Sequence, residues 1–128
     1  MKILVVEDDE AQLEWLERSL SNRGHDIHTA EDGDLAIAAY LMSRPFDLVI
    51  TDYCYPGKAI PNGSVLIKTI RAVDPGQPFI MQTSEKRVDL PRGIPLLHKP
   101  YSTKRLLVEV SKAHRQRLPL FPFNSESL

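Results

Sequence analysis

Three acidic side chains stand together near the start of the chain. Glu7, Asp8 and Asp9 directly follow the apolar run ILVV. Carboxylates this close repel one another unless a cation neutralises them or some of them take up protons. Oxygen ligands without a cluster of His or Cys favour Mg²⁺ over zinc. The run therefore indicates a magnesium site, while Asp9 and Gln12 also have the spacing of a helix capping box, which assigns Asp9 to a helix start.

Further reactive side chains follow apolar segments later in the chain. Asp52 comes after FDLVIT, Thr83 and Ser84 come after PFIMQ, and Lys99 comes after IPLLH. A carboxylate can itself be the nucleophile in phosphoryl transfer. A metal ion and a lysine ammonium can then neutralise the charge on the phosphoryl oxygens.

The segments that must position these side chains alternate between strand and helix patterns. Short apolar or β-branched runs predict strands, and leucine-rich stretches with helical spacing predict helices. Strands are expected at 3–6, 25–30, 46–51, 78–83 and 95–98, and helices at 10–23, 34–42, 63–73 and 102–116. This alternation predicts a parallel sheet with helices on both faces, which binds its ligand outside the carboxyl ends of the strands. The reactive side chains should therefore meet at one edge.

Composition excludes several classes of protein. The chain has 128 residues, 42% of them hydrophobic and 26% charged, which fits one globular domain. Its 16 basic and 17 acidic residues argue against a nucleic-acid surface. Cys54 is the single cysteine and cannot form an internal disulfide, so a cytoplasmic location is expected. No apolar run approaches the length of a membrane span, so membrane insertion is not expected.

Four motifs together resemble a response-regulator receiver domain of two-component signal transduction, the CheY-like family. They are VVEDD, LVITDYCYP, IMQTSE and HKPY, which stand in the family's order at the ends of expected strands. The resemblance covers residues 1–117 and leaves 118–128 as a C-terminal tail. It implies a flavodoxin-like, doubly wound sheet of five parallel strands in the order 2-1-3-4-5.

The resemblance assigns the phosphoryl chemistry to particular residues. It implies that Asp52 accepts a phosphoryl group from a sensor histidine kinase or a histidine phosphotransfer protein. Thr83 would hydrogen-bond the phosphoryl group, and Lys99 would pair with it. The chain would then be a signalling phosphoacceptor that phosphorylates and dephosphorylates itself, and not an enzyme acting on other substrates.

The resemblance also implies a Mg²⁺ cofactor and names its ligands. Asp8 would bind the ion directly, and Glu7 would be the second acid, acting directly or through water. Asp52 and the backbone carbonyl of Cys54 would complete the set of protein ligands.

Three departures from the family pattern concern regulation. The loop between Asp52 and Gly63 is longer than usual, and Leu96 stands where the family places its aromatic switch residue. The interval Ser84 to His98 has only fifteen residues, interrupted by prolines and a glycine, so the family's fourth helix is predicted to be short or absent. A loop that becomes ordered on phosphorylation is then expected to replace the rotamer switch. Ser84, Glu85 and Leu96 are expected to modulate the site.

Several alternatives remain open at the level of the sequence. The tail is too short for an output domain, which predicts a single-domain regulator with an unknown downstream target, or a module cut from a hybrid histidine kinase. A pseudo-receiver that binds partners without phosphorylation is a further possibility. A phosphatase or phosphotransferase with an aspartyl nucleophile is another rival. Such enzymes commonly carry a second acid two residues after the first, and Cys54 at that position argues against this class.

Overall fold

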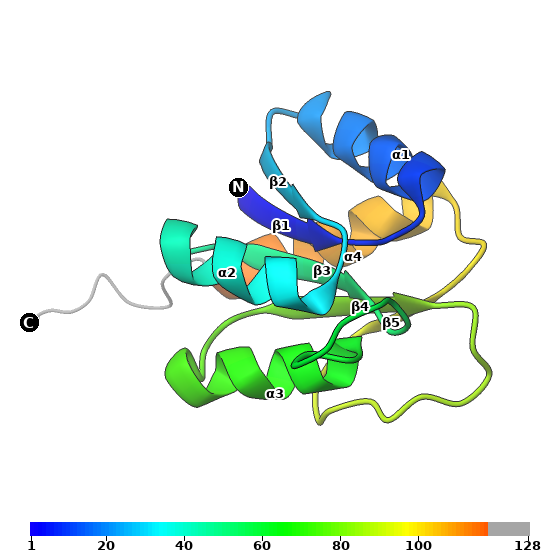
Figure 1. The fold of residues 1–128 in the computed structure, drawn as a ribbon. Coiled ribbons are helices and arrows are strands. Elements are labelled where there is room, and N and C mark those ends of the chain that lie inside the picture. The colour runs from blue at the N-terminus through cyan, green and yellow to red at the C-terminus, as the bar shows by residue number, and fades with distance from the viewer. Residues whose placement is uncertain (118–128) are drawn as a thin grey trace, which may run out of the picture.

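The computed structural model describes residues 1–117, which form five strands and four helices (Figure 1). Strands and helices alternate as far as β4, which is followed directly by β5. All neighbouring strands are parallel, and their order in the sheet is β2-β1-β3-β4-β5. This is the predicted flavodoxin-like arrangement. The elements are β1 (Lys2–Val6), α1 (Glu10–Ser21), β2 (Asp26–Ala30), α2 (Gly33–Ser43), β3 (Leu48–Asp52), α3 (Gly63–Val73), β4 (Phe79–Thr83), β5 (Leu96–His98) and α4 (Thr103–Arg117).

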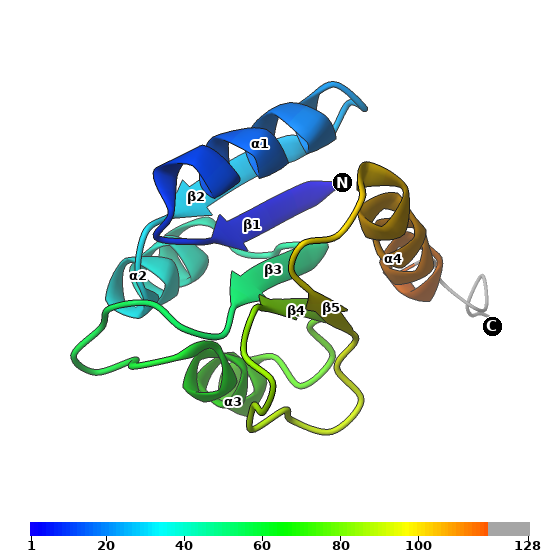
Figure 2. The same cartoon turned by 90° about the vertical axis from the view of Figure 1, so that its right-hand side faces the viewer.

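Two apolar cores lie on opposite faces of this one sheet. The helices α2 and α3 cover one face of the sheet, and α1 and α4 cover the other (Figure 2). Leu4 and Val6 of β1 pack with α2 and α3, whereas Ile3 and Val5 pack with α1 and α4. Successive side chains of a strand point to opposite faces, so a central strand buried on both faces must be apolar throughout. This explains the continuous run ILVV at the start of the chain.

The register of the strands brings their carboxyl ends to one edge. Val6 of β1 pairs with Thr51 of β3, and Asp52 pairs with Gln82 of β4. Residues that follow these positions therefore leave the sheet together. Asp9 starts α1 as predicted, because its side chain accepts the backbone N–H of Gln12 at 3.0 Å.

The predicted loss of the family's fourth helix is confirmed, since residues 84–95 are all described and contain no helix. The helix labelled α4 instead follows β5, where residues 102–116 were expected to be helical.

Side chains of α3 hold the loop between β4 and β5. Ser64 donates to the carbonyl of Asp89, Lys68 pairs with the Asp89 carboxylate at 3.1 Å, and Arg71 donates to the carbonyl of Arg92 at 3.0 Å.

The long loop between β3 and α3 is irregular, as its prolines and glycines indicate, and it is tied to α2. The Asp34 carboxylate accepts the backbone N–H groups of Lys58, Ala59 and Ile60 at 3.0, 3.1 and 2.9 Å. Gly33 lies so close to this loop that a Cβ would stand 2.2 Å from the carbonyl oxygen of Ile60. Only glycine allows that approach.

Two expectations concern the ends of the chain and the membrane. The tail 118–128 lies outside the described residues. Among the helices of residues 1–117, none is long and apolar enough to cross a membrane.

Candidate functional site

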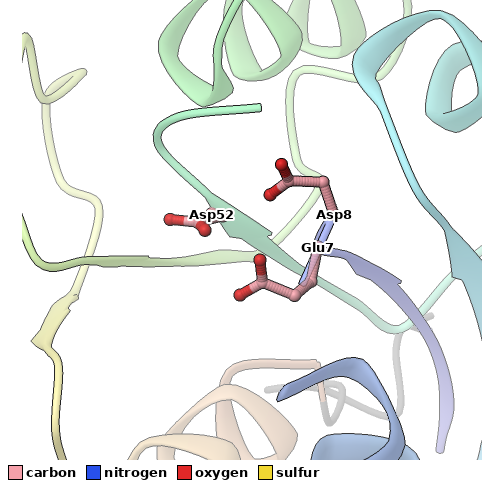
Figure 3. A group of neighbouring side chains, drawn as sticks. All are labelled: Glu7, Asp8 and Asp52. Carbon is pink, nitrogen blue, oxygen red and sulfur yellow. The ribbon is translucent and has the colours of Figure 1, made fainter. Parts of the chain in front are cut away.

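Three carboxylates converge at the carboxyl edge of the sheet. Glu7 and Asp8 follow β1, and Asp52 is the last residue of β3 (Figure 3). One carboxylate oxygen of each lies within 4.8 Å of the others. Glu7 and Asp52 are buried, while Asp8 is exposed, so the cluster opens to solvent on one side. The structure thus brings together the three acids that the sequence assigned to a metal.

Lys99 lies between two of these acids. Its ammonium is 2.7 Å from Glu7 Oε1 and 2.9 Å from Asp52 Oδ2. Burial alone would lower the pKa of Lys99, but the hydrogen bonds that its ammonium donates to the two carboxylates outweigh burial and raise the pKa. The lysine is therefore a fixed positive charge at neutral pH, placed to pair with an anion at Asp52.

The acids themselves need more positive charge than one lysine supplies. Burial raises the pKa of Glu7, although its bonds with Lys99 and the Asp9 N–H oppose that shift. Desolvation also raises the pKa of Asp8, and the nearby Glu7 carboxylate adds to it. A divalent cation would favour the ionised form of both acids. The donor set, hard oxygens with an open side, fits Mg²⁺, which binds few protein carboxylates and keeps other ligands.

Thr83 ends β4, one residue beyond the strand partner of Asp52. Its hydroxyl is buried and accepts the backbone N–H of Glu85 at 3.0 Å. The backbone N–H of Lys99 donates to the carbonyl of Thr83 at 2.8 Å, which joins the ends of β4 and β5. The hydroxyl proton remains available for an acceptor near Asp52.

Cys54 stands two residues after Asp52 and is exposed. Its backbone forms an isolated antiparallel bridge with Asn62, which closes the long loop beside the site. Partial desolvation raises the pKa of the thiol, and the carboxylates of Glu85 and Asp52 raise it further. A thiol of raised pKa is poorly suited to nucleophilic or redox chemistry, so the role assigned to the Cys54 carbonyl stays the prediction for this residue.

The sequence model of the response regulator receiver domain matches residues 3–110. The chain belongs to this family. The receiver is 35% identical over 115 residues to the DNA-binding response regulator MtrA of Mycobacterium tuberculosis, covering 85% of this chain and 48% of that protein. The receiver thus spans about half the length of the curated relatives it matches.

Solved structures agree with the family assignment. The signal receiver domain of an HD domain-containing protein from Pseudomonas fluorescens is 28% identical to the receiver, with a TM-score of 0.81 over 91% of this chain and 95% of that one. The response regulator TrrA of Thermotoga maritima, solved in complex with Mg²⁺-BeF, is 29% identical, with a TM-score of 0.77 over 88% of this chain and 97% of that one.

The remaining residues predicted to modulate the receiver lie around the site in different settings. Ser84 and Glu85 are exposed at the start of the loop after β4. Leu96 is half-buried in β5 and packs against the core beneath α2 and α3.

Sequence reasoning missed two residues of the receiver site. Gln82 is fully buried in β4, and its Nε2 donates to Glu7 Oε1 at 3.1 Å. The Tyr101 hydroxyl donates to Gln82 Oε1. The signal for Gln82 was an amide inside the otherwise apolar strand segment FIMQ, because a buried amide requires partners.

Proposed function

We propose that this receiver accepts a phosphoryl group on Asp52 from a histidine kinase or a histidine phosphotransfer protein, in a reaction that depends on Mg²⁺. The observation that carries the proposal is the position of Asp52. Its carboxylate is held by Lys99 and by the backbone N–H of Tyr53 at 2.8 Å, beside two further acids at the open edge of the sheet.

The transfer follows from this arrangement. A carboxylate oxygen of Asp52 forms a bond to phosphorus while the bond from phosphorus to the donor's histidine nitrogen breaks, and the electron pair of that bond stays on the nitrogen. Lys99 then faces the new phosphoryl oxygens, and the Thr83 hydroxyl donates to one of them. Mg²⁺, when bound, neutralises the charge on these oxygens.

The residues proposed to hold Mg²⁺ are Asp8, Glu7, Asp52 and the backbone carbonyl of Cys54. Support comes from the raised pKa values of Glu7 and Asp8 and from their oxygen-only chemistry. The likeness to TrrA, which was solved with Mg²⁺-BeF, supports the same ligand class.

The proposal extends to partners and location. Signalling would proceed by a conformational change read by a downstream protein, in the cytoplasm, where the free thiol of Cys54 needs no disulfide partner. The balance of 16 basic and 17 acidic residues supports a receiver that makes no direct contact with nucleic acid.

Intact-mass measurement after incubation with a small phosphodonor tests the proposal. The wild-type protein should gain one phosphoryl group in Mg²⁺ and none in EDTA. Asp52→Asn should gain none, whereas Asp26→Asn, which removes an exposed acid of β2, should behave as wild type. Modification that persists in Asp52→Asn, or that proceeds unchanged in EDTA, would refute the assignment.

A further inference from the structure

A chain of buried hydrogen bonds leads away from the acid cluster. Gln82 has none of its surface exposed, yet both ends of its amide are bonded. Its Nε2 donates to Glu7 Oε1 at 3.1 Å, and its Oε1 accepts the Tyr101 hydroxyl. Since the hydroxyl donates to the oxygen, the amide must turn its N–H group toward Glu7.

Gln82 differs from the other donors to Glu7. Glu7 Oε1 also accepts from Lys99 at 2.7 Å, and Glu7 Oε2 accepts from the Asp9 N–H at 3.1 Å. Lys99 is shared with Asp52, and the Asp9 N–H belongs to the start of α1. Two side chains of the described residues donate to Glu7, and of these Gln82 does not also bond Asp52. Gln82 can therefore fix the direction of the Glu7 carboxylate whatever occupies the phosphoryl site.

Tyr101 extends the chain of bonds to the groove between α1 and the loop before α4. The centroid of its ring lies 5.7 Å from the centroid of the Trp15 ring on α1, with an angle of 59° between the ring planes. The Gln12 side chain of α1 approaches the same hydroxyl at 3.5 Å. These groups line a pocket of about 390 Å³ formed by Gln12, Trp15, Ser84, Lys99, Pro100 and Tyr101. A change at Glu7 therefore has a continuous route to this groove.

We propose that Gln82 and Tyr101 are positioning residues. They orient the Glu7 carboxylate for the metal, and they transmit the change that metal binding causes at Glu7 to the groove at Trp15. The proposal rests on the proposed function, because it takes Glu7 to be an acid of the Mg²⁺ site. Groups that orient a ligating carboxylate typically contribute a factor of 10 to 100 to metal affinity. This chain of hydrogen bonds from Glu7 to Tyr101 requires no movement of the sheet, because each bond joins two side chains that are already in contact.

Calorimetric titration with Mg²⁺ tests the positioning role. Gln82→Met should weaken the Kd about 10-fold or more, and Tyr101→Phe should weaken it about fivefold, the effect of one neutral hydrogen bond. Because Tyr101 acts through Gln82, the double variant should bind no more weakly than Gln82→Met alone. Losses that simply add would show that the two residues act independently and would overturn the link.

The chain offers a matched control at the opposite edge of the sheet. Gln77 is also a buried glutamine, and it accepts the hydroxyl of Tyr40 at 2.8 Å. Gln77→Met removes a similar bond far from the acids and should leave the Mg²⁺ Kd unchanged. An equal loss of affinity in Gln77→Met would show that any buried glutamine has this effect, and it too would overturn the inference.

Trp15 is the single tryptophan and reports on the groove directly. Saturating Mg²⁺, or Mg²⁺ with beryllofluoride, should change its emission in the wild-type protein. Tyr101→Phe keeps the ring against Trp15 but removes the hydroxyl, so the change should be lost at Mg²⁺ concentrations that calorimetry shows to be saturating. A purely structural role would leave the emission change intact, and that result would overturn the relay even if Gln82→Met fails to fold.

The two levels of the proposal fail in different ways. A wild-type protein that binds no Mg²⁺ would remove both the proposed function and this inference. A wild-type protein that binds Mg²⁺ and takes up phosphoryl, with Gln82→Met and Tyr101→Phe indistinguishable from it, would remove this inference alone.

Discussion

At the scale of single residues, Lys99 offsets part of the repulsion within the acid cluster. Glu7 and Asp52 are buried and share this one ammonium. Removing one member of a buried ionic group leaves the other charges desolvated and unpaired. The loss in free energy of unfolding is then larger than the stability that the intact group contributes.

We predict that Lys99→Met lowers the free energy of unfolding by about 3 kcal/mol in EDTA. Mg²⁺ should restore part of that loss, because the cation neutralises the same carboxylates. Urea unfolding in EDTA and in Mg²⁺ measures both effects.

Lys68→Met is the matched control for Lys99. Lys68 pairs with Asp89, but both side chains are more than half exposed, at 60% and 69%. Exposed pairs contribute less than about 1 kcal/mol, so the variant should lose little stability and show no recovery in Mg²⁺. Equal losses in the two lysine variants would mean that the acids at the site are not coupled to Lys99.

Cys54 and Glu85 stand at the mouth of the site and are both exposed. We predict that Cys54→Asn and Glu85→Ala change the rate of dephosphorylation more than they change Mg²⁺ affinity. The reason is that their side chains are expected, from the family, to control access of water, while only the backbone of Cys54 is assigned to the metal. Decay of phosphorylated protein followed by intact mass, with calorimetry of Mg²⁺ binding, makes the comparison. A large loss of Mg²⁺ affinity in Cys54→Asn with an unchanged lifetime would contradict it.

At the scale of elements, Asp34 at the start of α2 holds the loop between β3 and α3. The backbone N–H groups of Lys58 and Ile60 lower the pKa of Asp34. A depressed carboxyl pKa contributes stability that is present above the unfolded value of 3.8 and is lost as pH falls through the folded value.

Asp34→Asn should therefore be less stable than wild type at neutral pH, and the difference should shrink as pH falls below about 4. Hydrogen exchange at neutral pH should show lost protection of the amides of residues 58–60. Glu31→Gln, which changes an exposed acid just before α2, should alter neither property. A stability difference that persists unchanged in acid would mean that the charge of Asp34 is not what holds the loop.

The loop between β4 and β5 has one half that is bonded to α3 and one half that is exposed. Asp89 and Arg92 are bonded to α3, whereas residues 84–87 are exposed. The Thr83 hydroxyl can donate to a phosphoryl oxygen while it accepts the N–H of Glu85, so a shift of Thr83 would carry the start of the loop with it.

We predict that Mg²⁺ with beryllofluoride increases amide protection at residues 84–88 and leaves residues 89–94 nearly unchanged. Hydrogen exchange with and without the mimic measures this, and Asp52→Asn is the control that should show no change. Equal protection of the whole loop in both states would rule out an order–disorder response.

At the scale of the whole molecule, the two apolar cores share one sheet. Ile67 of α3 belongs to one core and Leu106 of α4 to the other, and neither is exposed. The strands between the two cores contribute alternate side chains to both of them. Unfolding one core would therefore expose apolar side chains of the other core to water.

We predict one cooperative unfolding transition in which both cores take part. Ile67→Ala and Leu106→Ala should each lower the free energy of unfolding by about 2–5 kcal/mol and shift a single transition. Far-UV circular dichroism and Trp15 fluorescence should give the same midpoint in each variant. Separate midpoints, with Trp15 responding only to Leu106→Ala, would show that the cores unfold independently.

The patterns in the sequence were enough for a parallel sheet and for most of the site, whereas the strand order 2-1-3-4-5 came from the resemblance to the receiver family. Alternating strand and helix patterns are local properties, and a parallel sheet places the carboxyl ends of all its strands at one edge. The sequence therefore predicted that Glu7, Asp52, Thr83 and Lys99 converge. The absence of a helix after β4 was also predictable from the sequence, because Pro91, Gly93 and Pro95 disfavour helix at the residues next to them.

What only the tertiary structure decided are the pairings between distant side chains. The amide of Gln82 reaches Glu7, 75 residues away, and the Asp34 carboxylate binds a loop 24–26 residues further on. Neither contact leaves a periodic trace in the chain, because it depends on strand register, helix position and side-chain direction together. The sequence pointed to Leu96 as the altered switch position, and that stays a prediction. For the same reason only the structure shows that Tyr101 is hydrogen-bonded to Gln82, which in turn donates to Glu7.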